Sequence, residues 1–267
     1  MSGIRGAPFA HNPVNRISYL VFFTVLLSAP LQAGAHDDTL FTAILMDHVV
    51  NGAVNYTDIA KDERLDTYLG QLAETKAIEL PSREAQLAFW INAYNAYTLK
   101  LVASVPAAES ITEITGLGTK GDADTAKPWD QAIAEIGGET YTLNHIENEI
   151  IRPEFNDARI HFALVCAAYS CPQLRNEAYV PDRLDEQLNE QGRHFMTHRN
   201  VIDPRTRTAQ LSQIFKWFDV DFGSDEKELL RYLANFVGVP AANSLRNEAR
   251  RWTVSYSEYV WSLNDRP

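Results

Sequence analysis

The chain of 267 residues has little basic charge and little cysteine. Its 24 Lys and Arg residues are outnumbered by 35 Asp and Glu residues, so the formal net charge is −11 and a nucleic-acid partner is not expected. The sequence contains no internal repeat, low-complexity tract or long Pro/Ser linker that would divide it. Because 45% of the residues are hydrophobic, one large domain with an ample core is expected, although the length would also suit two small domains.

Only one apolar run is long enough to concern a membrane, and it lies near the N-terminus. Two arginines accompany the run at residues 17–29, and Ala33-Gly34-Ala35 then provides a small-x-small cleavage pattern. The run is short for a permanent membrane-spanning helix, which is the alternative interpretation, and no cysteine follows it for lipid attachment. The pattern therefore predicts a signal peptide at residues 1–35 and one exported domain at residues 36–267, periplasmic or secreted and without a stable membrane anchor.

Periodicity and capping residues predict a helix-rich α+β domain with a small, mostly antiparallel sheet. Helices are expected at residues 40–50, 63–75, 83–104, 144–153, around 184–195, and after Ser224; a strand or short helix is expected at 129–136, and strands at 140–143 and 159–166.

The segment 159–166, RIHFALVC, is apolar on both alternating faces, which is typical of a strand covered on both sides. Such a strand would place His161 and Cys166 about 16 Å apart and on opposite faces. Cys171 follows a predicted turn at residues 168–170 and can fold back, whereas its alternatives are a disulfide with Cys166 or simple burial. Disulfides persist in the oxidising compartment that export implies. A buried histidine needs hydrogen-bond partners or a function.

The predicted helix 83–104, capped by Ser82, is apolar nearly all round, yet it carries Asn92 and Asn95 three residues apart. Two buried amides need several partners, so they form either a structural polar network or part of a substrate site. Glu147 has two interpretations as well. It completes a capping box with Asn144, or it orients a histidine.

Two other motifs are rejected, and neither a cofactor nor a metal is predicted. Residues 116–121 match a dinucleotide fingerprint in letters, but no strand precedes them and no apolar helix follows. His194 and His198 are four apart on a predicted helix, but no third ligand is near in sequence.

Several segments together resemble the bacterial and plant family known as domain of unknown function 547. The matching segments are 88–96 (AFWINAYNA), 143–147 (LNHIE), 151–153 (IRP), 159–166 (RIHFALVC), 170–172 (SCP), 211–217 (LSQIFKW), 221–223 (DFG) and 261–264 (WSLN). Asn148 and Val260 depart from this pattern, since the family often carries a histidine and an acidic residue there. The resemblance implies no established activity. By analogy alone, a buried helix followed by a strand that begins with histidine is similar to papain-like and transglutaminase-like proteins.

These observations lead to two hypotheses of function. The first is an exported thiol-dependent hydrolase or acyl-transfer enzyme that acts on peptide, amide or thioester bonds in the cell envelope. The second is a non-catalytic envelope protein that binds a small ligand or peptide. The expected catalytic residues are His161, Glu147 and Cys171, and the expected substrate-binding residues are Asn92, Asn95, Arg152 and Cys166.

Overall fold

The structure, a computed structural model, describes residue 3, residues 36–115 and residues 127–266. The predicted signal peptide and the glycine motif at 116–121 lie outside the described residues. The described residues from His36 onward form one compact unit. Within the described ranges, no helix is long and apolar enough to cross a membrane.

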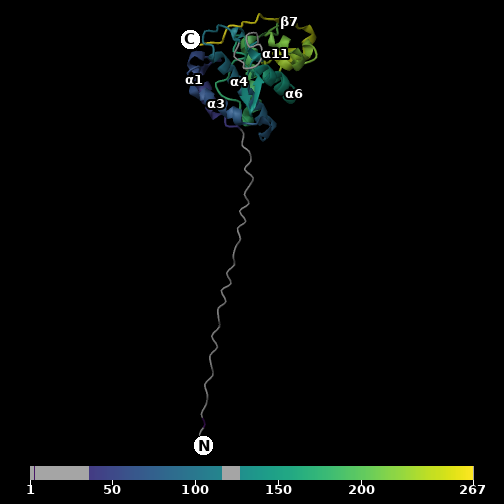
Figure 1. The fold of residues 1–267 in the computed structure, drawn as a ribbon. Coiled ribbons are helices and arrows are strands. Elements are labelled where there is room, and N and C mark those ends of the chain that lie inside the picture. Colours follow the sequence, from purple (N-terminus) through teal and green to yellow (C-terminus); the bar gives the residue numbers. More distant parts are fainter. Residues whose placement is uncertain (1–2, 4–35, 116–126, 267) are drawn as a thin grey trace. The chain divides into compact units, whose positions relative to one another are not determined.

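The described residues form a helix-rich α+β domain (Figure 1). The α-helices are α1 (Thr39–His48), α2 (Tyr56–Ile59), α3 (Glu63–Glu74), α4 (Arg83–Ala103), α5 (Leu143–His145), α6 (Arg152–Phe155), α7 (Leu184–Arg199), α8 (Ile214–Trp217), α9 (Asp219–Phe222), α10 (Glu226–Leu233) and α11 (Ala241–Glu248). Shorter or wider helical turns are η1 (Ala77–Glu79), η2 (Ile111–Glu113), η3 (Pro128–Asp130), the π-helix η4 (Ile146–Ile151), η5 (Ala158–Phe162), η6 (Pro181–Arg183) and η7 (Ala249–Arg251).

The strands form small, separate sheets. They are β1 (Val49–Val50), β2 (Ala53–Val54), β3 (Ala132–Ile136), β4 (Glu139–Thr142), β5 (Val201–Asp203), β6 (Thr208–Leu211) and β7 (Thr253–Tyr256). The pairs β1–β2, β3–β4 and β5–β6 are antiparallel, whereas β7 joins β6 in parallel. The predicted mostly antiparallel arrangement is confirmed, although it is divided among several sheets.

Helix α4 is the centre of the larger hydrophobic core, and it lies between the N-terminal helices and the C-terminal part of the chain (Figure 1). Ser82 begins the helix as predicted, because its hydroxyl accepts a hydrogen bond from the backbone N–H of Ala85 at 3.1 Å. Side chains on every face of α4 are buried, so the helix contacts neighbours all round. A second core lies beneath α7 to α11 and the β5–β6–β7 sheet.

The predicted strand at 159–166 is wrong, because the chain forms the 3-10 helix η5 there and then irregular backbone. Asp157 accepts a hydrogen bond from the backbone N–H of Arg159 and starts a helical turn. The N–H groups of Ala163 and Leu164 then both donate to the carbonyl of Ile160, which closes the turn. A run that is apolar on every face is compatible with any buried conformation, so its periodicity alone does not identify a strand.

Two helix boundaries also differ from the prediction. Thr142, rather than Asn144, caps the helix at its N-terminus, and the helix continues past Pro153 to the end of α6. Asp225, rather than Ser224, caps α10. In both cases a nearby residue with a similar capping side chain caps the helix instead. The sequence therefore predicts that a helix forms but not at which residue it begins.

Candidate active site

A cavity of about 380 Å³ collects most of the chemically active side chains. Its lining comes from α4, the α5–η4 helix, η5, the cysteine loop, α8 and the C-terminal segment. The lining residues are Tyr94, Lys127, Trp129, Asp130, Asn144, Glu147, Asn148, His161, Leu164, Cys166, Cys171, Ile214, Trp217, Phe218, Tyr259 and Trp261. The cavity therefore contains all three predicted catalytic residues, together with Cys166.

His161 is held on one side by a residue that the sequence analysis did not select. Its Nε2 lies 2.7 Å from Oδ2 of Asp221, and its ring stacks on Phe218 at 4.0 Å between centroids. Arg152 donates to the same carboxylate from Nε at 2.7 Å and from Nη2 at 3.0 Å. The hydrogen bond from His161 and that from Arg152 hold the pKa of Asp221 well below its usual range, against the effect of burial. Arg152, predicted to bind substrate, is thus engaged with Asp221 and does not line the cavity.

Glu147 lies on the other side of the imidazole, at 3.8 Å from Nδ1. This separation exceeds hydrogen-bond distance, so Asp221 rather than Glu147 fixes the ring. The second oxygen of Glu147 accepts a hydrogen bond from the Tyr94 hydroxyl at 3.2 Å. Burial raises the pKa of Glu147, and the nearby His161 and Tyr94 only partly oppose that effect. The site therefore contains a carboxylate that stays ionised, a histidine, and a carboxyl group that accepts a proton more readily than usual.

The two cysteines lie against each other on the same cavity. A turn closed by the Cys171 N–H and the Ala168 carbonyl returns the chain, as predicted. The two Sγ atoms are 2.7 Å apart, both are free thiols, and the backbone N–H of Cys166 donates to Sγ of Cys171 at 2.7 Å. The expectation that Cys166 faces away from His161 is wrong, because it depended on strand alternation and no strand forms.

The environments of the two thiols differ. Burial favours a raised pKa for Cys166, but its hydrogen bonds with Cys171 and with the Tyr259 hydroxyl, 3.0 Å from Sγ, outweigh that effect and lower the pKa. Burial and the adjacent Cys166 sulfur raise the pKa of Cys171 well above its ordinary value. Cys166 is partly exposed, whereas Cys171 is 3% exposed. Cys166 therefore combines the greater exposure with the lower pKa.

Asn92 and Asn95 are buried and bind backbone, not the cavity. Asn95 donates to the Ala163 carbonyl and accepts from the Val165 N–H, each at 3.0 Å. Asn92 makes the same pair of bonds with the backbone of Tyr179, at 2.8 and 2.9 Å. The structure thus supports the polar-network interpretation of both residues. Asn95 fixes the segment between His161 and Cys166.

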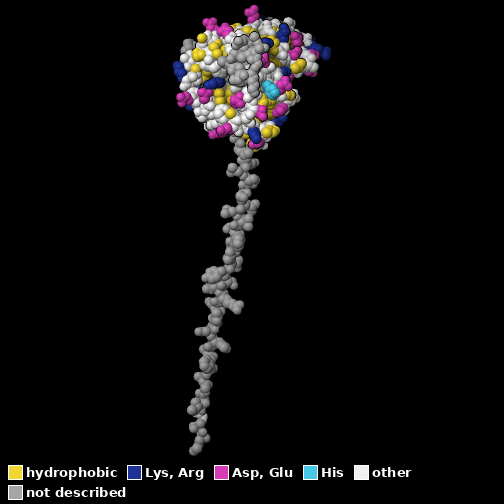
Figure 2. Space-filling view, in the orientation of Figure 1, with side chains coloured by type: hydrophobic (Ala, Val, Ile, Leu, Met, Phe, Trp, Pro, Cys, Tyr) yellow, Lys and Arg dark blue, Asp and Glu magenta, His cyan; other side chains and the backbone are white. Residues whose placement is uncertain are grey.

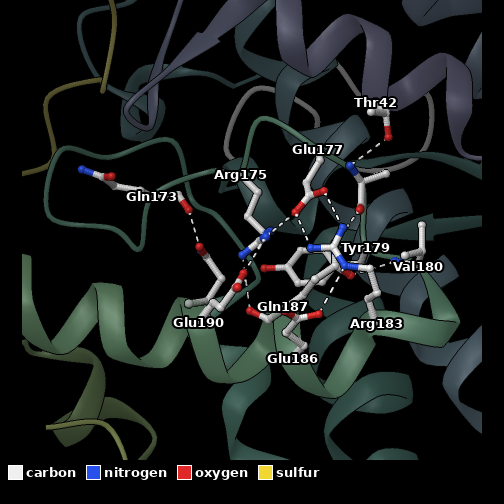
Figure 3. Close-up of polar contacts among 12 residues, drawn as sticks. Thr42, Gln173, Arg175, Glu177, Tyr179, Val180, Arg183, Glu186, Gln187 and Glu190 are labelled. Carbon is white, nitrogen blue, oxygen red and sulfur yellow. Dashed lines mark hydrogen bonds and ion pairs between the residues drawn. The ribbon is translucent and has the colours of Figure 1, made fainter. Parts of the chain in front are cut away.

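The segment that leaves the cysteine loop is fixed by a charged network (Figure 3). Arg175 pairs with Glu177 and Glu190, and Arg183 pairs with Glu177. The amide of Gln187 on α7 accepts from the Val180 N–H at 2.9 Å and donates to the Ala178 carbonyl at 2.9 Å. This network attaches the backbone after Cys171 to α7, so the loop is supported from outside as well as by Asn92.

Aromatic rings form one wall of the cavity. Trp261 contacts three rings, with centroid distances of 5.8 Å to Trp129, 5.7 Å to Trp217 and 4.6 Å to Tyr259. Three of the chain's five tryptophans thus surround this cavity, and Trp217 is 46% exposed. Rings in mutual contact leave no room for a ligand between them, so they present a continuous apolar surface to whatever occupies the cavity.

The other predicted features contribute no site. His194 and His198 stack on each other at 3.9 Å, and His198 Nδ1 bonds the His194 carbonyl. Among the described residues there is no group of three or more His, Cys, Asp or Glu side chains arranged to hold a metal ion. Acidic and basic side chains are interspersed on the visible face of the molecule (Figure 2).

Asp221 and Tyr259 are residues of the candidate site that the sequence analysis did not select. Asp221 belongs to the DFG segment that carried the family resemblance, so that segment was the available signal. Periodicity in the sequence could not predict that these residues contact His161 and Cys166, because 60 positions separate Asp221 from His161 and 93 separate Tyr259 from Cys166.

Comparison with known proteins identifies one family. Residues 78–196 match the model of the family described as a protein of unknown function, DUF547. No curated protein and no solved structure gives a significant match, so the likeness to papain stays a prediction. The matched residues include α4, the α5–η4 helix, η5 and both cysteines, whereas Asp221 and Tyr259 lie beyond them. Residues 78–196 of this chain are thus a DUF547 region.

Proposed function

We propose that this protein is an exported thiol-dependent hydrolase or acyl-transfer enzyme, with Cys166 as its nucleophile. The observation that carries the proposal is that one cavity holds a thiol with a lowered pKa and a histidine anchored by an ionised aspartate. A nucleophile, a base and a group that orients the base are the components of covalent acyl transfer.

The tautomer of His161 supports its role as the base. Because the Asp221 carboxylate is ionised and accepts from Nε2, that nitrogen carries the hydrogen and Nδ1 keeps its lone pair in the neutral ring. Neither Cys166 nor Cys171 is hydrogen-bonded to the ring in the described structure, so a water or the bound substrate carries the proton between Sγ and Nδ1. Such contacts commonly tighten only when substrate binds.

The chemical steps follow from these positions. The Cys166 thiolate attacks the carbonyl carbon, and its proton resides on His161, where Asp221 stabilises the positive charge. The imidazolium then protonates the leaving amine, alcohol or thiol as the bond to the carbonyl breaks. Water, or a second acceptor, attacks the resulting thioester and releases the acyl group and Cys166. Glu147, which faces the same Nδ1, holds or returns a proton in the second half of the reaction.

Cys166 replaces Cys171 as the proposed nucleophile because of access and charge. Cys171 is buried and its pKa is raised, so little thiolate forms there at neutral pH. Cys166 is partly exposed, and its Sγ lies 3.0 Å from the Tyr259 hydroxyl, which can donate to the thiolate and so favours it.

The second candidate function is a non-catalytic envelope protein that binds a small ligand or peptide. The aromatic wall favours it, since Trp129, Trp217, Trp261 and Tyr259 supply contact area without chemistry. The direct contact of the two thiols also favours it, because a disulfide would remove the nucleophile.

Trapping of an acyl-enzyme distinguishes the two functions. The reduced protein is mixed with an activated thioester or p-nitrophenyl ester, quenched in acid, and its intact mass and peptides are measured. We expect acylation of Cys166 in the wild type, none in Cys166→Ser, and at least a tenfold slower reaction in His161→Ala, in line with the loss of a general base. Tyr169→Ala, an exposed aromatic residue outside this cavity, is the matched control and should acylate normally.

Acylation that is equally fast in His161→Ala, or that falls on surface lysines instead of Cys166, would contradict the enzyme. The binding function would then lead, and it is tested separately by the change in tryptophan fluorescence when ligands are added to wild type and to Trp217→Ala.

A further inference from the structure

The Cys166–Cys171 pair has an asymmetry that acyl transfer does not require. Acyl transfer uses one thiol, yet a second thiol lies 2.7 Å from the first and is buried behind it. A disulfide bond is about 2.05 Å long, so the two sulfur atoms need move by less than an ångström to form one. Both cysteines line the cavity, but Cys166 is partly exposed and Cys171 is only 3% exposed.

The loop that carries the pair is held firmly on its far side. The backbone N–H groups of Tyr169 and Ser170 donate to carbonyls of the C-terminal segment at Ser262 and Val260, at 2.7 and 3.3 Å. The Ala167 carbonyl accepts from Asn264 at 2.9 Å. Both cysteines therefore keep their relative positions without depending on a bond between the sulfurs, and the pair can open and close with little movement of the backbone.

We propose that this pair carries out thiol–disulfide exchange with low-molecular-weight disulfides, in which Cys166 attacks and Cys171 resolves. The cavity of about 380 Å³ beside Cys166 has room for a small disulfide, and its aromatic wall would contact the substituent on the disulfide sulfur that Cys166 attacks. The hydroxyl of Tyr259 lies 3.0 Å from Sγ of Cys166 and stabilises the attacking thiolate. Cys171 is only 3% exposed, so a disulfide that is already attached to Cys166 reaches it more readily than a free disulfide from solvent does.

The steps balance without another oxidant. The Cys166 thiol releases its proton to water in the cavity and attacks the disulfide RSSR, which forms the Cys166–SR bond and expels RS⁻, which takes up a proton. Cys171 then loses its proton and attacks Sγ of Cys166, which forms the Cys166–Cys171 disulfide and expels the second RS⁻. The net reaction oxidises the two protein thiols and reduces RSSR to two RSH; an excess of RSH reverses it.

This activity does not depend on the proposed hydrolase, but it bears on it. When the pair is oxidised, Cys166 has no thiolate for acyl transfer, so the ratio of small thiol to disulfide in the compartment would set the active fraction. Failure of exchange would leave the acyl-transfer proposal untouched, since that proposal requires the thiol of Cys166 but not that of Cys171.

Oxidised glutathione is the probe for the test. The reduced full chain is mixed with it and quenched in acid at intervals, and released glutathione, intact mass and peptides are measured. We expect the wild type to lose two hydrogens and to release two equivalents of glutathione. Cys171→Ser should stop as a stable Cys166–glutathione mixed disulfide, with one equivalent released. Cys166→Ser should retain a free Cys171 throughout.

Tyr259→Phe tests whether the hydroxyl of Tyr259 acts on the Cys166 thiol, because a purely structural role of Tyr259 would not change how alkylation of Cys166 depends on pH. It removes the hydroxyl beside Cys166, so the pH at which the alkylation rate of Cys166 is half-maximal should rise. Should Cys166→Ser fail to fold, brief alkylation of the reduced wild type with iodoacetamide and peptide mapping answers the same question, with Cys166 modified before Cys171. Equal rates at the two cysteines, or a wild-type mixed disulfide that never resolves, would overturn the proposal.

Discussion

Asn95→Leu is the substitution whose effect follows most directly from the structure. Asn95 is 1% exposed in the middle of α4, and Leu has nearly its size and shape. Its amide makes two hydrogen bonds, one to the Ala163 carbonyl and one from the Val165 N–H, on a segment that has left regular structure. The substitution removes both bonds without leaving an empty space.

The magnitude comes from the two backbone groups left without partners. A buried donor or acceptor that loses its hydrogen bond costs about 1–3 kcal/mol, so two groups cost about 2–6 kcal/mol. The added apolar side chain returns about 1–2 kcal/mol. The midpoints of these ranges predict that the free energy of unfolding falls by about 2–3 kcal/mol, which lowers the thermal midpoint of a domain of this size by about 4–12 °C.

Two other variants make the measurement specific. Thr98→Val also removes a buried polar group from α4, but its hydroxyl bonds only a helix carbonyl, so a loss of about 1 kcal/mol or less is expected. Asn92→Leu removes the same chemistry at Tyr179. Both Asn variants should lose stability in urea unfolding at unchanged slope, but only Asn95→Leu should also speed alkylation of Cys166, because only Asn95 fixes that segment. A free energy of unfolding within about 0.5 kcal/mol of wild type for Asn95→Leu would refute the reasoning.

Three further outcomes are expected. Burial raises the pKa of Asp38 to about 7, above its unfolded value of about 4, so the free energy of unfolding should fall as pH rises from about 4 to about 7. Asp38→Asn should remove this pH dependence. At pH 8 its free energy of unfolding in urea should exceed that of the wild type by on the order of a few kcal/mol. The φ of Ala167 is +58°, which costs about 1 kcal/mol for alanine, so Ala167→Gly should be at least as stable as wild type. Ala168→Gly is the control and should lose about 1 kcal/mol of stability. Equal losses for the two variants in urea unfolding would contradict this expectation. Material recovered from the periplasm or medium should lack residues 1–35 by intact mass, and retention of that segment would disprove cleavage.

The sequence predicted the framework of helices well, for a physical reason. Amphipathic or fully apolar stretches of more than ten residues carry enough periodicity to identify α1, α3, α4 and α7, and Ser82 marks the start of α4 by its own hydrogen bond. The failures occur where a segment is short and buried on all sides. Residues 159–166 are equally apolar in every direction, so only tertiary contacts decide their backbone, and the amide of Asn95 supplies the partners that a neighbouring strand would otherwise give.

The candidate site divides along the same lines. His161, Glu147 and Cys171 were predicted within one region, and all three line one cavity. The relation among them was not predicted, because it depends on contacts between distant segments. Asp221 reaches His161 from α9, and Tyr259 reaches Cys166 from the C-terminal segment. No local sequence pattern predicts these long-range contacts, because they depend on how the helices pack.

The position of Asp221 also explains why the matched segment of the chain is insufficient to form this site. Residues 78–196 supply the thiols, His161 and Glu147, but the groups that set their chemistry come from later in the chain. Phe218 stacks on His161, and Asp221 holds its Nε2, so α8 and α9 select the tautomer that leaves Nδ1 as a base. Without them the imidazole would have Glu147 as its nearest carboxylate, at 3.8 Å and with a raised pKa, and neither the orientation nor the tautomer of the ring would be fixed. The chemistry proposed for the cavity is therefore a property of the whole domain, assembled around α4, and not of the motif that identifies the family.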